Sequence, residues 1–396
     1  MFYKKNIERI GNNMKKIAII GAGISGLYLA NIFKQNSDFK VLLFEKNEEI
    51  SLDDGYGLQL SNNSVKLLNY IGFDQLDDSQ KFFPDNLDFY SIDNPDKICD
   101  LNISKFNSTN NKYTTIKRSS LIKFLISKIS KDDIFYGHNI SKIDLKEDQI
   151  ELSFSNEYSG KFDYLIIADG VFSKSSSLIS NSKNSLKFNN SVAIRGTINR
   201  DKIEKINFQN ISLFLGANFH YVIYPTSENE DLNFIGILRK NLNKNRLKNY
   251  QQLNSSDFVD EIVSEIPPTY NQIIHKLDNL KCFPVFITDE ILHPNNKNIF
   301  TVGDAFFAFP PSFAQGASQS IEGSHELFQN FSINETEKYF PRRLKKTKMV
   351  NKRSKFNQFA FHLSNPLFVL TRNLIMKRLV KNEKFLESYL GKIYDN

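Results

Sequence analysis

The segment from Lys16 to Glu45 restricts the possible folds of this chain more than any other. A short apolar run typical of a buried parallel strand ends at the glycine-rich turn GAGISG (residues 21–26), and an apolar segment at helical spacing follows. A second strand, from Phe39 to Phe44, ends at Glu45. The order of strand, glycine turn, helix, strand and acid predicts a βαβ unit that binds a nucleotide.

The glycines and the acid have separate roles in this prediction. Gly21 would permit the tight turn, Gly23 would let the backbone approach a pyrophosphate, and Gly26 would let helix and strand pack closely. Glu45 would accept hydrogen bonds from ribose hydroxyls, and the helix N-terminus would face the phosphates. NAD, FAD and a purely structural turn all remain compatible with this motif alone. The other predicted contacts here are Ile24, Ser25 and Lys46.

Two later strands also end in an acid and a glycine. The run KFDYLIIADGVFSKS (residues 161–175) reads as one strand ending at Asp169-Gly170, and IFTVGDAFFAFPPSFAQGASQSIE (residues 299–322) as a strand ending at Gly303-Asp304. In open α/β sheets, ligands bind at the carboxyl ends of the strands. Asp304 would bond a ribityl hydroxyl, and amides where Gln315, Gly316 and Ala317 open the next helix would face the polar edge of a flavin. An ordinary strand-ending turn is the alternative at Asp169.

Together these segments resemble the single-component flavoprotein monooxygenases of the para-hydroxybenzoate hydroxylase fold, the group of the salicylate hydroxylases and tetracycline-inactivating monooxygenases. The family's fingerprints match GAGISG with Glu45, Asp169-Gly170 with Ser173, and Gly303-Asp304 with Pro311 and Gln315-Gly316. Arg118 matches the arginine that opens a helix and contacts the cofactor, and Gly57 and Gln59 match the segment that passes near the flavin.

Four positions depart from the family pattern. Ser176 stands where an arginine is usual, Phe307 where a histidine is usual, Ala314 where a glycine is usual, and Gly323 where an acid is usual. FAD binding is expected to survive these changes. The four changes are expected to affect the contacts to the nicotinamide pyrophosphate.

The predicted fold is α/β: a Rossmann-like FAD-binding domain with an inserted antiparallel-sheet substrate domain and a C-terminal helical tail. The FAD-binding domain is predicted at 14–84, 112–180 and 298–337, the substrate domain at 85–111 and 181–297, and the tail at 338–396. Four strand-like runs between Ser191 and Leu238, a helix from Asp257 to Leu277 and a return strand from Phe283 to Ile291 make up most of the insertion. Because only one glycine-rich nucleotide turn occurs, no second nucleotide domain is expected, and the resemblance implies that NAD(P)H binds transiently.

The tail carries the positive charge of the chain. From Tyr339 to Asn396 there are 14 Lys or Arg and 3 Asp or Glu, a net charge of +11, which leaves −4 for the rest. Asn365-Pro366 predicts a helix start, and the interpretation favoured here is that the tail packs on its own protein or on a second subunit. A basic helix on an anionic membrane is the alternative, and no recognition motif supports nucleic acid. The apolar residues expected to pack are Leu367, Leu370, Leu374, Leu386 and Leu390.

The resemblance implies a reaction in which NAD(P)H reduces FAD, dioxygen adds to give a flavin C4a-hydroperoxide, and one oxygen passes to an electron-rich substrate. The expected function is hydroxylation or epoxidation of a small, mostly apolar, aromatic compound. An FAD-dependent dehydrogenase or reductase of the same fold, and a flavin-binding protein without turnover, are the alternatives. An apolar loop with Phe309 and Pro311, together with Phe306, Phe307, Pro310 and Phe313, would form a wall beside the flavin.

Residues for substrate chemistry are predicted on one strand. His220 and Tyr224 are offset to share a face while Tyr221 points the other way, and His220 would take a proton from a phenolic substrate. A structural role is the alternative for His220. Arg195 would pair with a substrate carboxylate or form an ordinary ion pair.

Other patterns argue against a metalloprotein, a membrane-spanning protein and a secreted protein. Cys99 and Cys282 lack metal or redox spacing, and the six histidines form no ligand set, so we expect no metal and a cytoplasmic location. No run approaches about 20 apolar residues, and residues 1–13 do not resemble a secretory signal. The expected partners are a small-molecule substrate and O2, with the chain a monomer or homodimer.

Overall fold

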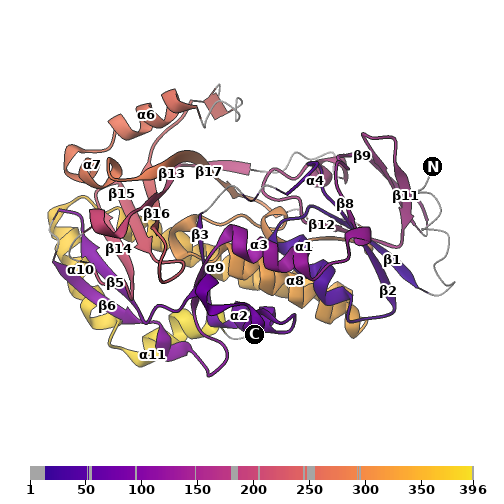
Figure 1. The fold of residues 1–396 in the computed structure, drawn as a ribbon, viewed down its shortest axis with the longest axis horizontal. Helices are drawn as coiled ribbons and strands as arrows, with labels where there is room; N and C mark the ends of the chain where they lie inside the picture. The colour runs from indigo at the N-terminus through magenta and orange to yellow at the C-terminus, as the bar shows by residue number, and fades with distance from the viewer. Residues whose placement is uncertain are drawn as a thin grey trace.

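A computed structural model describes residues 14–50, 52, 56–93, 96–147, 149–179, 186–203, 206–243, 246–247, 255–291, 293 and 296–394. The segment 1–13 and the predicted domain boundary at 180–181 lie outside the described residues. The molecule is elongated, with a parallel sheet at one end and a seven-stranded sheet at the other (Figure 1). The predicted α/β class with additional sheets and C-terminal helices is confirmed.

The first sheet has the order β18-β12-β1-β2-β8, and all its pairs are parallel. Alternate residues of β1 face two different cores. Ile17 and Ile19 face helices, whereas Ala18 and Ile20 face a small antiparallel sheet, β11-β10-β9. The strands are β1 (Lys15–Ile20), β2 (Phe39–Phe44), β8 (Ile134–Phe135), β9 (Ile140–Leu145), β10 (Ile150–Phe154), β11 (Ser159–Phe162), β12 (Tyr164–Ile167) and β18 (Ile299–Thr301).

Three helices pack together on the helical face of the parallel sheet. Helix α1 is buried along nearly its whole length and contacts both α3 and α8. Its apolar composition explains this, because a helix without a polar face is stable only when surrounded by protein. The helices around this body are α1 (Ile24–Phe33), α2 (Asn62–Asn69), α3 (Arg118–Ser127), α4 (Lys174–Ile179) and α8 (Gly316–Ser332).

The second large sheet has the order β17-β13-β16-β15-β14-β5-β6. It is antiparallel, as predicted for the inserted sheet, except for the pair β14 and β5, which is parallel. Its strands are β5 (Asn86–Ser91), β6 (Lys97–Asn102), β13 (Leu186–Ile198), β14 (Ile211–Gly216), β15 (Phe219–Tyr224), β16 (Leu232–Arg239) and β17 (Asp278–Thr288). One face packs on α6 (Ser256–Ser264) and α7 (Pro268–Ile274), and the other faces the tail.

Two predicted elements are divided in the structure. The helix expected from Asp257 to Leu277 breaks between α6 and α7, because Pro268 cannot continue a helix and starts a new one. The strand expected in residues 161–175 is divided at Asp163, whose carboxylate accepts the backbone N–H of Lys16 at 2.7 Å. β11 therefore joins the small sheet and β12 the parallel sheet. A three-stranded sheet, β3 (Gly57–Leu60), β7 (Thr114–Lys117) and β4 (Lys81–Phe82), joins the two ends of the molecule.

The tail is helical, as predicted, but its helices expose different faces. Leu386 and Leu390 are buried, whereas Leu367, Leu370 and Leu374 are exposed. Packing on the same chain is therefore wrong for these three, and packing on a second subunit stays a prediction. The reason is that α10 is apolar around most of its circumference, and its opposite face covers the large sheet. The tail comprises α9 (Tyr339–Phe361), α10 (Pro366–Leu379), α11 (Glu383–Leu386), a π-helical turn (Glu387–Gly391) and α12 (Lys392–Tyr394). In the described residues, none of the helices has the length and apolar character needed to cross a bilayer.

Candidate cofactor and substrate site

The glycines of the first turn have different surroundings. Gly21 has a φ of +105°, and a Cβ there would lie 2.6 Å from the carbonyl oxygen of Ala168. A Cβ on Gly26 would lie 2.0 Å from the carbonyl oxygen of Gly21, so only glycine lets α1 approach the turn this closely. A Cβ on Gly23 would meet no atom within 4 Å. Gly23 therefore borders open space at the N-terminus of α1.

Glu45 joins this turn to the end of β2. Its carboxylate accepts the N–H of Ala22 at 2.9 Å with one oxygen and the N–H of Asn47 at 3.1 Å with the other. The side chain is buried, while the adjacent Lys46 is exposed. Each carboxylate oxygen can accept a further hydrogen bond, so Glu45 can still bind a hydroxyl group that reaches the turn.

The three acid or glycine turns lie side by side, because β1, β12 and β18 are neighbours in the parallel sheet. Ala168 donates to the carbonyl of Ile20 at 2.8 Å, and Val302 donates to the carbonyl of Ile167 at 2.9 Å. Gly303 approaches the first turn so closely that a Cβ would lie 2.2 Å from Oγ of Ser25. The carboxyl ends of three neighbouring strands thus form one edge.

Asp169 and Asp304 can both bind a ligand at this edge. Oδ2 of Asp169 accepts the N–H of Ser175 at 3.0 Å and its hydroxyl at 2.8 Å, whereas the buried Oδ1 has no partner in the described part of the chain. Dense surrounding protein raises the pKa of Asp304 to about 6, yet its side chain is exposed. Asp304 therefore lies in a recess, because many protein atoms surround its carboxyl group while one side stays open to solvent.

These features fit FAD. Added Cβ atoms on Gly23, Gly170 and Gly316, from three separate segments, would all meet open space, as in a cradle left free for a ligand. Gly316 opens the 17-residue helix α8, with Ala317 next to it, so two helix N-termini border the edge. The unpaired oxygen of Asp169 supplies an acceptor for a hydroxyl group.

The small three-stranded sheet brings Gly57, Gln59 and Arg118 together. Gly57 pairs with Lys117, and the N–H of Arg118 donates to the carbonyl of Tyr56 at 2.8 Å. Gly57 also donates to Oδ1 of Asn233 at 2.5 Å, and a Cβ there would lie 2.8 Å from Tyr224. Gly57 is therefore the point at which this segment contacts the large sheet.

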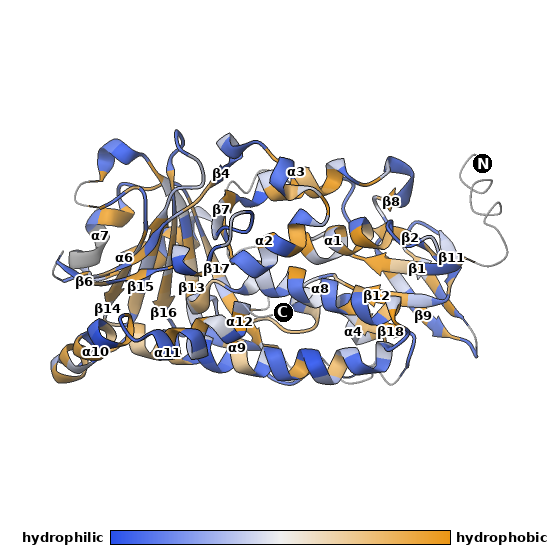
Figure 2. Cartoon of the chain, turned by 90° about the horizontal axis from the view of Figure 1, so that it is seen from below, coloured by the Kyte–Doolittle hydropathy of each residue, from blue (hydrophilic) through white to orange (hydrophobic). Residues whose placement is uncertain are grey.

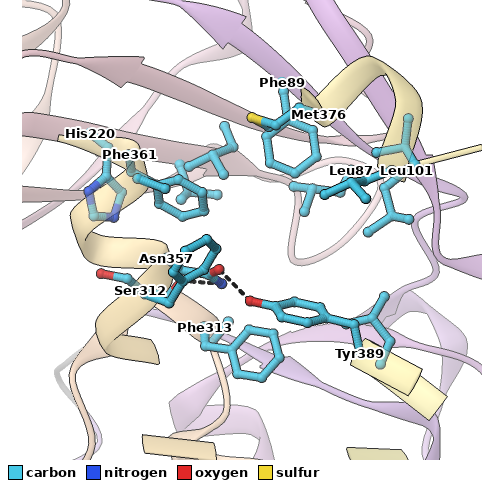
Figure 3. Close-up of a pocket in the computed structure, with 18 of the residues that line it drawn as sticks. Leu87, Phe89, Leu101, His220, Ser312, Phe313, Asn357, Phe361, Met376 and Tyr389 are labelled. Atoms are coloured by element: carbon cyan, nitrogen blue, oxygen red, sulfur yellow. Dashed lines mark hydrogen bonds between the residues drawn. The ribbon is translucent and has the colours of Figure 1, made fainter. Parts of the chain in front are cut away.

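A cavity of about 520 Å³ lies between the large sheet and the tail (Figure 3). Leu213, Val222 and Ile235 stand opposite one another on adjacent strands and form its floor. The tail contributes aromatic and aliphatic side chains from α9, α10 and the π-helical turn. Its remaining wall is the loop 311–315, which follows Gly303-Asp304 and leads into α8.

Few polar groups line the cavity, and most are paired. Nδ1 of His220 lies 2.6 Å from Nε2 of His362, and burial, followed by the proximity of His362, lowers the pKa of His220 well below its usual value. Tyr389 donates to Oδ1 of Asn357 at 2.6 Å, and Asn357 donates to the carbonyl of Ser312 at 3.3 Å (Figure 3).

Arg372 is the only charged residue among the described cavity residues. Its guanidinium donates to the carbonyl of Ala360 at 3.1 Å and to Oδ1 of Asn373 at 3.0 Å. The chemistry of these walls therefore favours an uncharged ligand.

The structure brings some predicted catalytic residues to this cavity and not others. His220 and Pro311 line it, and Tyr221 lies on the opposite face of β15, as the alternation predicted. Tyr224 shares the face of His220 but lies beside Gly57, outside the cavity lining. Arg195 lies over the ring of Tyr56, with Cζ 5.3 Å from its centre.

The predicted aromatic wall is only partly at the cavity. Phe313 lines it together with Pro311, whereas Phe306, Phe307 and Phe309 pack in the core of the first body. Sequence reasoning missed His362, Asn357 and Tyr389. The only local signal for them was the helical spacing of the tail, which did not indicate the face that each would occupy.

The four departures have local explanations. Ser176 interacts with Ser173, their hydroxyl oxygens lying 2.8 Å apart, and Phe307 is buried against Phe309. Ala314 adopts a left-handed φ of +50°, which favours glycine. A Cβ on Gly323 would lie 2.7 Å from Nε of the buried Arg343. Arg343 in turn donates to Glu322 and Gln319, so it joins α8 to α9.

Comparison with known proteins finds similarity to a Rossmann-like domain family and to monooxygenases. Residues 19–53 match the family model of the NAD(P)-binding Rossmann-like domain. The chain is 20% identical to 3-amino-4-hydroxybenzoate 2-monooxygenase of Streptomyces platensis, over 90% of this chain and 91% of that protein.

Solved structures are similar over almost the whole chain. Klebsiella pneumoniae HpxO in complex with FAD and uric acid has a TM-score of 0.78 and 16% identity, with 98% of each chain covered. A salicylate hydroxylase substrate complex has a TM-score of 0.78 and 17% identity, with coverage of 98% of this chain and 96% of the other.

Proposed function

We propose that this chain, which has the fold of the FAD-dependent monooxygenases, is an enzyme that uses FAD, NAD(P)H and O2 to hydroxylate or epoxidise an uncharged, mostly apolar aromatic compound. One observation carries the proposal. The loop 311–315 lines the apolar cavity and also connects the Asp304 turn to the N-terminus of α8. A compound in the cavity would thus border the edge that fits FAD.

The cofactor would be held by groups from all three strand ends. Gly23 would let the pyrophosphate approach the N-terminus of α1, Glu45 would bind the ribose, and Asp304 would bind the ribityl chain. Bound FAD would supply electron transfer and oxygen activation. The chain would exclude water from the reacting atoms, since the floor of Leu213, Val222 and Ile235 is apolar.

His220 would orient a substrate hydroxyl group. Its Nδ1 is engaged with His362, which leaves Nε2 for a ligand. Because burial lowers its pKa, the ring is neutral near pH 7 and would act as a hydrogen-bond partner more readily than as a charged group. A proton taken from a phenol would be disfavoured on His220, since burial and His362 both lower its pKa.

The decisive test uses purified FAD-loaded protein with NADH or NADPH, isotopically labelled dioxygen and a panel of phenols, aromatic acids and polyenes. We expect a neutral aromatic compound to accelerate NAD(P)H oxidation and to yield a product heavier by one labelled oxygen atom. Product without label would indicate a dehydrogenase or reductase, and retained FAD without any NAD(P)H oxidation would indicate a binding protein.

The Asp304→Ala variant tests the cofactor contact. It should weaken FAD binding by roughly 1–3 kcal/mol, the scale of a lost hydrogen bond that leaves a partner unpaired. Asp304→Asn keeps the shape and a donor and acceptor, so it should lose less. Equal FAD affinity for wild type and Asp304→Ala in a flavin titration would contradict the assignment.

The His220→Gln variant tests the substrate contact. Tyr221→Phe, on the opposite face of β15, is the matched control. We expect His220→Gln to lower kcat/KM for a phenolic substrate about tenfold or more, with FAD content unchanged and Tyr221→Phe close to wild type. Unchanged kinetics in His220→Gln would leave that residue with a structural role.

A further inference from the structure

The end of α9 and the outer face of α10 form an exposed apolar surface. Twelve large hydrophobic residues are exposed in the described part of the chain, and seven of them lie within 356–375. Leu367 is 67% exposed and Leu370 is 57% exposed. Figure 2 shows α10 with extensive orange colouring at one edge of the molecule. Here this surface is called the α10 patch; its residues are Phe356, Phe359, Leu367, Phe368, Leu370, Leu374 and Ile375.

The chain segment that carries the α10 patch is basic. Between Lys348 and Lys381 there are eight Lys or Arg and no Asp or Glu. Lys377 and Arg378, in the last turn of α10, are exposed next to Leu374. Two copies of this chain meeting through the patch would bring these like charges together, which opposes self-association.

The cavity opens at the same surface. Phe359, Phe368 and Ile375 are exposed members of the α10 patch and also line the cavity. An apolar rim of this kind is costly in water and is stabilised when it enters a lipid phase.

We propose that the α10 patch docks this protein on the surface of an anionic phospholipid membrane, with Leu367, Leu370 and Leu374 inserted among the lipids and the nearby Lys and Arg side chains at the headgroups. A helix with apolar residues and basic neighbours binds such an interface through both burial and charge. The face of α10 that covers the large sheet stays in place, so docking requires no unfolding. The inference is independent of the reaction that the cavity performs.

The test is flotation of full-length, FAD-loaded protein with phosphatidylcholine vesicles, with and without about 30% phosphatidylglycerol. We expect binding to the anionic vesicles only, and its loss at about 0.5 M NaCl because salt screens the charges. Leu370→Glu should weaken binding about tenfold or more, since it removes an inserted side chain and adds a negative charge. Ile333→Glu is the matched control, because Ile333 is also 57% exposed but lies outside the patch.

Charge reversal provides a second arm that does not alter the apolar residues. Lys377→Glu with Arg378→Glu should weaken binding at least tenfold, while Lys146→Glu with Lys161→Glu, both exposed at the other end of the molecule, should not. Two results would overturn the proposal. One is equal vesicle binding by wild type and Leu370→Glu. The other is a wild-type dimer that Leu370→Glu dissociates, without binding to vesicles, which would make a second copy the occupant.

Discussion

At the scale of single residues, Gly23 and Gly26 are three positions apart but face different surroundings. A Cβ on Gly26 collides with the carbonyl of Gly21, whereas a Cβ on Gly23 meets open space. We therefore expect Gly26→Val to impair folding, and Gly23→Val to fold normally but lose FAD because its side chain fills the ligand's place. Urea unfolding and flavin absorbance measure the two effects. Full FAD content in Gly23→Val would contradict the placement of the pyrophosphate at this turn.

Ala314 is a second residue at which backbone geometry makes a prediction. Its φ of +50° disfavours any residue with a Cβ, and glycine avoids that cost. Ala314→Gly should stabilise the protein by about 1 kcal/mol, measured by urea unfolding. Ala360→Gly, within α9, should have the opposite sign and a cost of about 1 kcal/mol. A loss of stability in both variants would contradict the expected strain.

Residues that act through neighbours in the chain could be predicted, and residues that act through distant ones could not. Gly21 and Gly26 are recognisable because a turn between a strand and a helix fixes their local geometry. His362 pairs with His220 across 142 positions, and neither segment contains a pattern that points to the other. The same applies to Arg343, whose buried guanidinium stands against Gly323.

At the scale of elements, Arg343 fixes how closely α8 and α9 pack. Gly323→Ala places a methyl group 2.7 Å from its Nε, and the hydrogen bonds of Arg343 to Glu322 and Gln319 prevent easy movement. Overpacking should cost about 1–3 kcal/mol, more than the gain in helix propensity of about 1 kcal/mol. Gly316→Ala in the same helix meets open space and should not destabilise the FAD-free protein. Urea unfolding of both FAD-free variants tests this; equal stability would contradict it.

Helix α10 shows what an apolar pattern can and cannot indicate. Its start was predictable, because Asn365 accepts the N–H groups of Leu367 and Phe368 as an N-cap, and Pro366 follows. Its buried face was not, because apolar residues occur on both sides of the helix. The side facing the sheet is chosen by tertiary packing of Met376 and Val380, which leaves the Leu370 side exposed.

At the scale of the whole molecule, the arrangement of the strands was the most predictable feature. Strand-like runs between Ser191 and Leu238 indicated an inserted sheet, and strand-ending acids indicated the ligand edge of the parallel sheet. The closure of the cavity by the tail could not be predicted. It depends on contacts of α9 and the π-helical turn with strands far away in sequence, and these strands carry no complementary motif.

The contact between tail and sheet makes a prediction for pH, because His362 of the tail pairs with His220 of β15. Burial, with Arg239 nearby, lowers the pKa of His362 to about 4, and burial lowers that of His220 as well. A histidine that binds its proton less tightly when folded loses stability as the pH falls below its unfolded pKa of about 6.5, until the pH reaches the folded value. From about pH 7.5 to about pH 5.5, each histidine should therefore cost about 1.3 kcal/mol, and the pair about 2–3 kcal/mol.

Urea unfolding at these two pH values can isolate the contribution of the pair. The double variant His220→Gln with His362→Gln should lose less stability between these two pH values than wild type does, by about 2–3 kcal/mol. Tyr221→Phe changes the other face of the same strand and should keep the wild-type pH dependence. Since other groups titrate equally in all three proteins, an identical loss in the double variant and wild type would show that the pair is not what couples tail docking to pH.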